Sequence, residues 1–306
     1  PERVHIIPDG ILGYLPFDLL LYEAGDGDSY LTRRHQLTYT YAPGFLPGLS
    51  NVPPAARAKG VLAMAPHFGT ATDTLSDSLW LAQRTALQPL RYNEREASAI
   101  HALWGGALQT GVAASKEAFL QEASTYSLIH IASHAAVNDQ EPGFSYVAFS
   151  PEADSQAYQL YLNEIFDLDL RADLVVLSAC ETGIGTFYQG EGMASLARGF
   201  SVAGARAVLT TLWKVDDAGS MRFMETFYRH LQEQPDAATA LHQTRLDFIE
   251  AGEHPYIWGA YLPSGDWAGV SPGTSSGSGL VPGIWVALLA GLIAIGIWRW
   301  QRHKQI

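Results

Sequence analysis

Short apolar runs alternate with helical patterns along most of this chain. The runs occupy residues 4–7, 61–65, 128–133, 174–179 and 205–212, and they are rich in Val, Ile and Leu. They show no regular alternation of apolar and polar residues, which is typical of strands buried on both faces of a sheet. We therefore expect strands at these five positions.

Helical patterns lie between the runs, over residues 93–103, 116–123, 193–202, 216–234 and 236–251. Ser115 is suited to cap the second of them, and Asp216 or Asp217 the fourth. Strands that alternate with helices predict an α/β fold, in which a mainly parallel sheet carries helices on both faces.

The composition changes after residue 263. Residues 264–279 are mostly Gly, Ser, Thr and Pro, with Asp266 as the only charge, which indicates a flexible linker. Residues 280–298 carry no charge and are long enough for one transmembrane helix, with Trp285 and Trp298 near its ends. A buried C-terminal helix is the alternative.

The tail at 299–306 is basic, so the positive-inside rule predicts a single-pass membrane protein with a cytoplasmic C-terminus. The opposite, tail-anchored orientation stays open. The chain starts at Pro1 without Met and enters a strand pattern at once. We therefore expect 1–263 to be a domain that lacks its extreme N-terminus.

Composition excludes several classes of site. The formal net charge is −12, which argues against a nucleic-acid partner because phosphate binding needs a cationic face. The single cysteine, Cys180, rules out a disulfide within this sequence and a zinc site built on cysteines. No His pair has a metal-binding spacing on a predicted helix, so we expect no metal.

Reactive side chains follow two of the predicted strands. His134 comes after the run at 128–133, and Cys180 after the run at 174–179. Because sites gather at the carboxyl ends of parallel strands, neighbouring strands would bring the two residues together. An imidazole beside a thiol draws it toward the nucleophilic thiolate. The alternatives are a buried structural cysteine and a hydrogen-bonded structural histidine.

Several strings resemble the CHAT family of caspase-like cysteine peptidases. Ile-His-Ile-Ala-Ser-His at 129–134 resembles the pattern around the family's catalytic His, with the second His functional. Leu-Ser-Ala-Cys-Glu-Thr-Gly at 177–183 resembles the pattern around its nucleophile. Caspases similarly place His about 50 residues before an Ala-Cys pair. Further matches lie at 7–10 with 15–17, at 190–200, at 204–217, and at 255–261, which resembles the closing strand.

The resemblance implies a His134–Cys180 dyad, with His130 as a structural residue one layer deeper in the same strand. It also implies an oxyanion site made by the backbone N–H groups of Ala135 and Cys180. The family usually has Gly where this chain has Ala135. If that position required positive φ, a Cβ would be costly and the oxyanion site compromised.

The resemblance to separases implies a pocket for a basic substrate side chain. In those relatives an Asp after a Trp-x-Val-x string lines the pocket for the P1 side chain, the one that precedes the cleaved bond. The string Trp213-Lys214-Val215-Asp216 in this chain places that role on Asp217, with Asp216 beside it. The alternative is that both acids cap the next helix.

Taken together, these residues predict a membrane-anchored cysteine endopeptidase that acts on a protein or peptide and needs no cofactor. A catalytically silent scaffold that recruits partners at the membrane is the rival, and helical repeats of the tetratricopeptide type are expected upstream. A Rossmann-type nucleotide binder fails, since no G-x-G-x-x-G string follows the first strand.

Overall fold

A computed structural model describes residues 2–8, 10–23, 28–40, 58–68, 87–138, 140–151, 158–178 and 191–270. The chain divides into two compact units, Pro1–Pro272 and Gly273–Ile306, and all the described residues belong to the first. Cys180 and the segment 280–298 lie outside the described residues.

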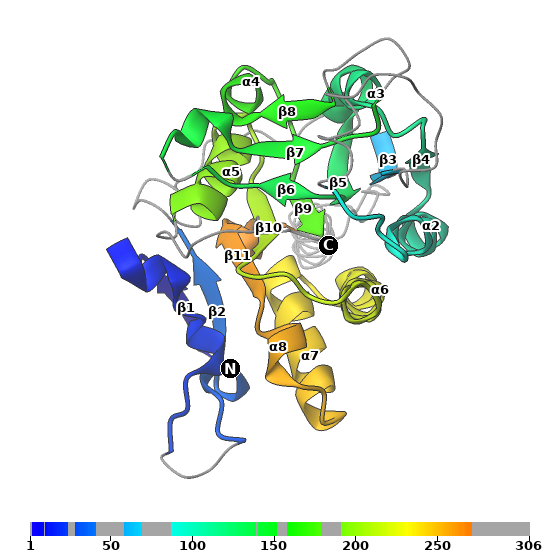
Figure 1. Ribbon diagram of the computed structural model, residues 1–306. Coiled ribbons are helices and arrows are strands. Elements are labelled where there is room, and N and C mark those ends of the chain that lie inside the picture. Colours follow the sequence, from blue (N-terminus) through cyan, green and yellow to red (C-terminus); the bar gives the residue numbers. More distant parts are fainter. Residues whose placement is uncertain are drawn as a thin grey trace, which may run out of the picture. The chain divides into compact units, whose positions relative to one another are not determined.

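An eight-stranded sheet forms the centre of the first unit (Figure 1). Neighbouring strands are parallel throughout, except that β10 and β11 are antiparallel. The mainly parallel sheet predicted from the sequence is thereby confirmed. In spatial order the strands are β1 Glu2–Ile6, β2 His35–Tyr39, β11 Tyr261–Gly265, β10 Ala207–Thr211, β9 Leu174–Ser178, β5 Tyr126–Ala132, β3 Ala58–Pro66 and β4 Gly106–Gly111.

Helices cover both faces of the sheet (Figure 1). One face carries α2 (Asn93–Trp104), α6 (Asp217–Glu233) and α7 (Ala237–Glu250). The other carries α3 (Lys116–Glu122), α4 (Leu162–Phe166), α5 (Glu191–Val202) and a three-stranded antiparallel sheet of β6 (Ala135–Ala136), β7 (Tyr146–Ala148) and β8 (Gln159–Tyr161).

Strand β3 shows why its sequence lacks polar alternation. Val61, Ala63 and Ala65 pack among the residues of the α2, α6 and α7 face, while Leu62 and Met64 pack on the opposite face. All five side chains are fully buried. Successive residues of a strand point to opposite faces, so a strand covered on both sides is apolar at every position.

Helices α3 and α6 begin where the predicted caps place them. The Ser115 hydroxyl accepts from Ala118 N and caps α3, and the Asp216 carboxylate accepts from Gly219 N and caps α6. Several short elements were not predicted, among them β2, β4, the three strands of the antiparallel sheet and the 3-10 turn η2 at Phe17–Leu19.

Two predictions near the end of the unit are wrong. Residues 255–261 are not the closing strand, because Pro255–Trp258 forms the short helix α8 and β11 starts only at Tyr261. The flexible linker does not begin at 264 either. Ser264 and Gly265 pair with β10, and the Trp267 side chain is fully buried. The Gly- and Ser-rich composition gave no sign of this order. The strand is held by main-chain hydrogen bonds, and the burial that follows it comes from the single Trp267 ring.

A buried ion pair fastens the N-terminal segment to the sheet and to α7. Arg245 Nη1 lies 2.8 Å from Asp18 Oδ1, and both side chains are almost completely buried. Arg245 Nη2 donates to Tyr261 O at 2.6 Å, and the Tyr39 hydroxyl donates to Asp18 Oδ2 at 3.2 Å. Burial raises the pKa of Asp18, and the Arg245 charge opposes that rise.

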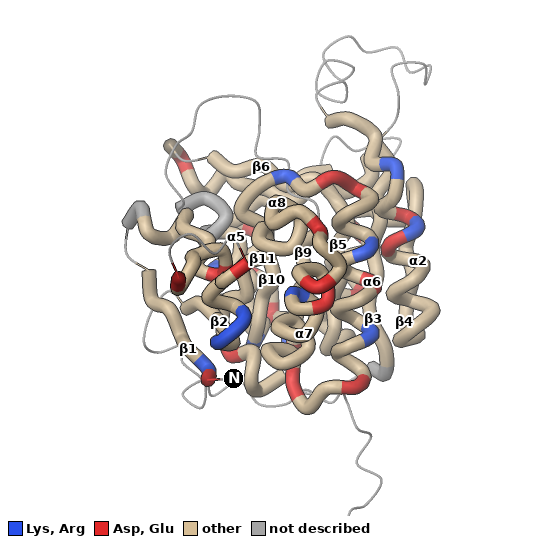
Figure 2. The backbone as a smooth tube through the Cα atoms, turned by 90° about the horizontal axis from the view of Figure 1, so that it is seen from below, with Lys and Arg blue, Asp and Glu red and all other residues tan. Residues whose placement is uncertain are grey.

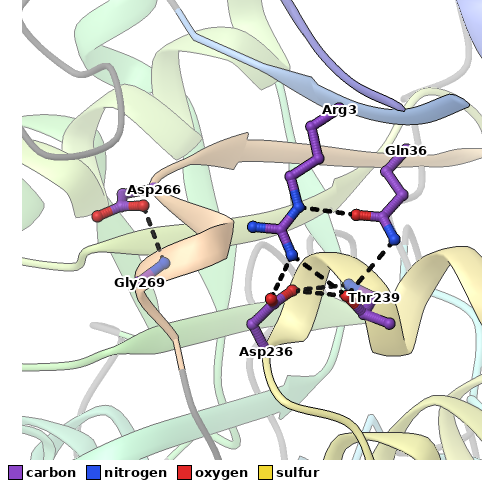
Figure 3. Close-up of polar contacts among 6 residues, drawn as sticks. All are labelled: Arg3, Gln36, Asp236, Thr239, Asp266 and Gly269. Atoms are coloured by element: carbon purple, nitrogen blue, oxygen red, sulfur yellow. Dashed lines mark hydrogen bonds and ion pairs between the residues drawn. The ribbon is translucent and has the colours of Figure 1, made fainter. Parts of the chain in front are cut away.

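A second polar cluster ties β1 to the start of α7 (Figure 3). Arg3 on β1 donates to Gln36 on β2 and to the Asp236 carboxylate, which also caps α7 through Thr239 N. The edge strand of the sheet is thus held by side chains as well as by its pairing with β2.

Charges of both signs are interspersed on α2, α6 and α7 (Figure 2). On α6, for example, Arg222 and Arg229 alternate with Glu225 and Glu233. These three helices therefore do not form the cationic face that phosphate binding requires.

Within the described parts of the chain, no helix has both the length and the apolar character to cross a membrane. The predicted transmembrane segment 280–298 stays a prediction, since it falls outside them.

Replacing Arg245 by Met tests the buried ion pair. The substitution leaves the Asp18 carboxylate buried without its counter-charge, so we expect the free energy of unfolding to fall by about 3–5 kcal/mol. Without the Arg245 charge the pKa of Asp18 rises further, so the deficit should be larger at pH 8 than at pH 5, where protonation relieves the charge. Urea unfolding followed by circular dichroism measures both values.

The control is Asp18→Asn combined with Arg245→Met, which removes both charges. It should be more stable than Arg245→Met alone at pH 8. A cost below about 1 kcal/mol for the single variant, the range of exposed ion pairs, would contradict the structural role of this pair.

Candidate active site

Strands β5 and β9 are neighbours in the sheet and run parallel. Their register pairs Leu128 with Leu174 and Ala132 with Ser178. Beyond the strand, Ser133 N donates to Ser178 O at 3.0 Å. The carboxyl ends of the two strands therefore meet at one edge of the sheet, as the sequence predicts. His134 follows β5 there, whereas Cys180 is not among the described residues.

His134 is almost completely buried and has defined neighbours. Its Nε2 lies 2.7 Å from Gln88 O, and the Phe68 ring is tilted against the imidazole with ring centroids 4.7 Å apart. A carbonyl oxygen can only accept a hydrogen bond, so Nε2 is the protonated nitrogen. In the neutral ring Nδ1 then carries the lone pair, and the Gln88 carbonyl sets the tautomer.

The Gln88 carbonyl belongs to the segment 87–93, which precedes and enters α2. Leu87 and Leu90 pack on a small cluster of Phe68, Ala148 and Tyr158. At the other end of the segment, the Asn93 side chain donates to Pro66 O at 2.8 Å and to Ala132 O at 3.3 Å. Asn93 thus holds the carboxyl ends of β3 and β5 together, two residues before His134.

Sequence reasoning missed Phe68, Gln88 and Asn93. Gln88 acts through its main chain, so no side-chain pattern could have indicated it. Asn93 occupies the first turn of a predicted helix, where an amide side chain is common and carries no signal of its own.

Ala135 adopts a conformation that any residue can take. It lies in β6 opposite Val147 of β7, and its side chain belongs to the buried core. The neighbouring pair, His134 opposite Ala148, is hydrogen-bonded, since Ala148 N donates to His134 O at 2.9 Å. Hydrogen-bonded and non-bonded pairs alternate along an antiparallel ladder, so the N–H of Ala135 points away from β7. Because β6 is the edge strand of that sheet, this N–H faces its open side.

His130 is a structural residue in the α2 and α6 face of β5. It is fully buried, its Nε2 lies 2.9 Å from Glu96 Oε1, and its Nδ1 lies 3.3 Å from the Tyr228 hydroxyl. Burial, and after it the Glu96 charge, raises the pKa of Tyr228 well above its usual value. The Tyr228 hydroxyl therefore stays protonated and donates a hydrogen bond to His130 Nδ1, while His130 Nε2–H donates a hydrogen bond to Glu96.

The two acids at the start of α6 differ in their contacts. Asp216 is exposed and caps the helix through Gly219 N at 2.9 Å. Asp217 is half-buried, and its Oδ2 accepts from Arg91 N at 2.9 Å. The structure thus assigns the cap to Asp216 and joins Asp217 to the segment that supplies the Gln88 carbonyl.

The CHAT domain family profile matches residues 1–266, almost the whole of the first unit. The chain belongs to the CHAT domain family. Its mixed α/β architecture, with a mainly parallel sheet between layers of helices, is consistent with a caspase-like fold. Within the described residues of this CHAT domain, no group of three His, Cys, Asp or Glu side chains is placed to hold a metal ion.

Two curated relatives share part of the domain. Tetratricopeptide repeat protein 28 of Mus musculus is 33% identical over 100 residues, which are 32% of this chain and 4% of that protein. The Homo sapiens protein of the same name is 32% identical over 101 residues, again 32% of this chain and 4% of the relative. The chain therefore spans about 4% of the length of these relatives.

Two solved structures are similar to this CHAT domain at low sequence identity. Separase in the Saccharomyces cerevisiae separase–securin complex is 12% identical, with a TM-score of 0.43 over 82% of this chain and 14% of that one. The Arg specific cysteine proteinase gingipain R is 8% identical, with a TM-score of 0.49 over 81% of this chain and 57% of that one.

Substitutions at Glu96 test the buried His130 cluster of the CHAT domain. Glu96→Ala leaves the Nε2–H of His130 without its acceptor, so we expect the free energy of unfolding to fall by about 1–3 kcal/mol. Glu96→Gln keeps an acceptor oxygen and should lose less than half as much. Urea unfolding at pH 7.5 compares the two. Equal losses in both variants would show that the charge of Glu96, and not its acceptor, stabilises the cluster.

Proposed function

We propose that this CHAT domain is a cysteine endopeptidase in which Cys180 is the nucleophile and His134 moves the proton. One observation carries the proposal. In the register of β5 with β9, every paired residue lies 46 positions from its partner, and the same separation joins His134 to Cys180. Continued by two residues, the same register would set position 180 opposite position 134. Membership of the CHAT family supports the same assignment.

The tautomer of His134 suits this reaction. The Gln88 carbonyl holds the Nε2–H, so the Nδ1 lone pair can take the proton of the Cys180 thiol. The thiolate attacks the carbonyl carbon of the peptide, and the imidazolium returns the proton to the leaving amine as the C–N bond breaks. A water molecule then hydrolyses the thioester with His134 as general base, which releases the acid and restores the thiol.

The oxyanion formed in both steps needs N–H donors. The Ala135 N–H, which faces the open side of β6, is our candidate, together with the N–H of Cys180. Because Ala135 is in an extended strand, replacement of the family's usual glycine does not exclude this role.

The substrate class is a protein or peptide, with a basic P1 residue as the preferred side chain. Asp217, with Asp216 beside it, is the acidic pair we assign to this preference. Both stand at the start of α6, just beyond the end of β10 and thus at the same edge of the sheet as His134. The family resemblance and the net charge of −12 support a cationic substrate.

We further propose that residues 280–298 anchor the domain in a membrane, on the apolar character of that segment. The names of the two curated relatives support a helical-repeat domain in the same full-length protein.

A silent scaffold is the second candidate, because the His134 side chain is only 1% exposed. A domain whose general base is that well covered could recruit partners without cleaving them.

Active-site labelling separates the two candidates. The full 306-residue chain, in mild detergent, is incubated with a peptidyl electrophile ending in Arg and with its norleucine twin. We expect one label per chain, faster with Arg, which is absent in Cys180→Ala and slowed at least tenfold in His134→Ala. Intact mass spectrometry measures the label. No label on a folded wild-type chain favours the scaffold, and equal rates with the two electrophiles remove the basic P1 preference.

Ala135→Pro tests the oxyanion donor. Proline removes the N–H on the open side of an edge strand, but its ring also restricts the preceding His134 and adds atoms at a buried position. The urea midpoint must therefore show that the variant is folded, and the alkylation rate of Cys180 must show that His134 still activates the thiol. Peptide cleavage should fall by about 100- to 1000-fold, the cost of one oxyanion donor. Ala135→Gly keeps the N–H and should stay within about threefold of wild type. Undiminished cleavage by the folded Pro variant would exclude Ala135 from this role.

A further inference from the structure

The first turn of α6 contacts segments that lead to both halves of the proposed dyad. Asp217 accepts from Arg91 N at 2.9 Å. Three residues along the helix, Ser220 Oγ lies 3.0 Å from Ser178 Oγ at the end of β9, and the Tyr261 hydroxyl donates to Ser220 at 3.3 Å. Ser178 is two residues before Cys180 in the sequence, and Arg91 is three residues after Gln88.

The Asp217 contact bears on His134 because of how the segment 87–93 is held. Apolar side chains fix its first part, and the Asn93 amide fixes its last part. Between them the main chain must place the Gln88 carbonyl 2.7 Å from His134 Nε2. Among the described hydrogen bonds, the one from Arg91 N to Asp217 ties this part of the segment to the first turn of α6.

We infer that Asp217 is a positioning residue for His134. Its carboxylate holds Arg91 and thereby the Gln88 carbonyl, which fixes the tautomer and orientation of the imidazole. The first turn of α6 then sets the relative positions of the histidine and of the nucleophile strand, the latter through Ser220 and Ser178. This inference rests on the proposed dyad, and it gives Asp217 a role beyond the choice of the P1 side chain.

The two roles of Asp217 make different demands on its chemistry. Attraction of a basic side chain needs the negative charge, whereas Arg91 N–H needs only an acceptor oxygen. Asn supplies the acceptor without the charge, and Ala supplies neither. A carboxylate has about four acceptor positions, so one residue can hold Arg91 and still meet a guanidinium.

The test uses iodoacetamide, a small electrophile that has no P1 side chain. Its rate constant with Cys180 reports how well His134 activates the thiol, and the mass gain is unambiguous because the sequence has one cysteine. We expect Asp217→Ala to react about fivefold more slowly than wild type, as for the loss of one hydrogen bond, and Asp217→Asn to stay within about twofold. With the Arg-ended electrophile, both variants should lose the preference for Arg.

Controls keep the inference separate from the proposed function. Asp236→Ala removes the cap of α7, which is not part of the site, so it should lower the urea midpoint without slowing alkylation. The rate constant of His134→Ala with iodoacetamide gives the reference value for a thiol without an assisting imidazole. If His134→Ala and wild type react equally fast, the dyad itself is refuted.

If His134→Ala is slow but Asp217→Ala matches wild type, the dyad stands and the positioning role is refuted. The role is also refuted if Asp217→Asn is slowed as much as Asp217→Ala, since the charge alone would then explain the effect. Urea midpoints measured for every variant identify any that is not folded at the labelling temperature. Should Asp217→Ala be such a variant, Asp217→Leu, which also has neither an acceptor oxygen nor a charge, is measured in its place with the same expectation.

Discussion

The parallel pairing of β5 with β9 is the constraint on which the rest of the site depends. A one-residue slip of register would turn every side chain of the shifted strand to the opposite face. Here both faces are buried, so a slip would move His130 away from Glu96 and Tyr228 and bury its imidazole without a partner in the apolar layer on the other face. The layers of helices therefore fix which residues of the two strands stand side by side at the carboxyl edge.

Main-chain groups do most of the positioning at that edge. The Gln88 carbonyl orients His134, the carbonyls of Pro66 and Ala132 receive the Asn93 amide, and the Ser178 carbonyl accepts from Ser133 N. Main-chain acceptors keep their chemistry whatever side chain they carry. A site built in this way depends on the path of the backbone, and that path depends in turn on the two apolar layers that cover the sheet.

The sequence was sufficient for the elements whose burial is continuous. The apolar runs predicted β3, β5, β9 and β10, and the caps at Ser115 and Asp216 marked the starts of α3 and α6. It was insufficient where main-chain pairing or a single tertiary contact determines the structure. The closing strand at Tyr261–Gly265 contains Pro, Ser and Gly, and its place depends on pairing with β10. Residues 87–93 carry no motif, so the sequence did not indicate their contacts with His134 and Asp217. Those two residues themselves lie in strings that resemble the family and could be identified directly.

Alanine after the histidine changes how relatives of this domain can be sorted. A position that needs positive φ is conserved as glycine, because every other residue is strained there. Ala135 lies in a short edge strand with its methyl group in the core, where alanine restricts the unfolded chain more than glycine does and adds buried contact. The exchange is therefore open to neutral drift. Under the proposed dyad, alanine at this position is no mark of lost activity, and loss of the residue at 134 or 180 is the better one.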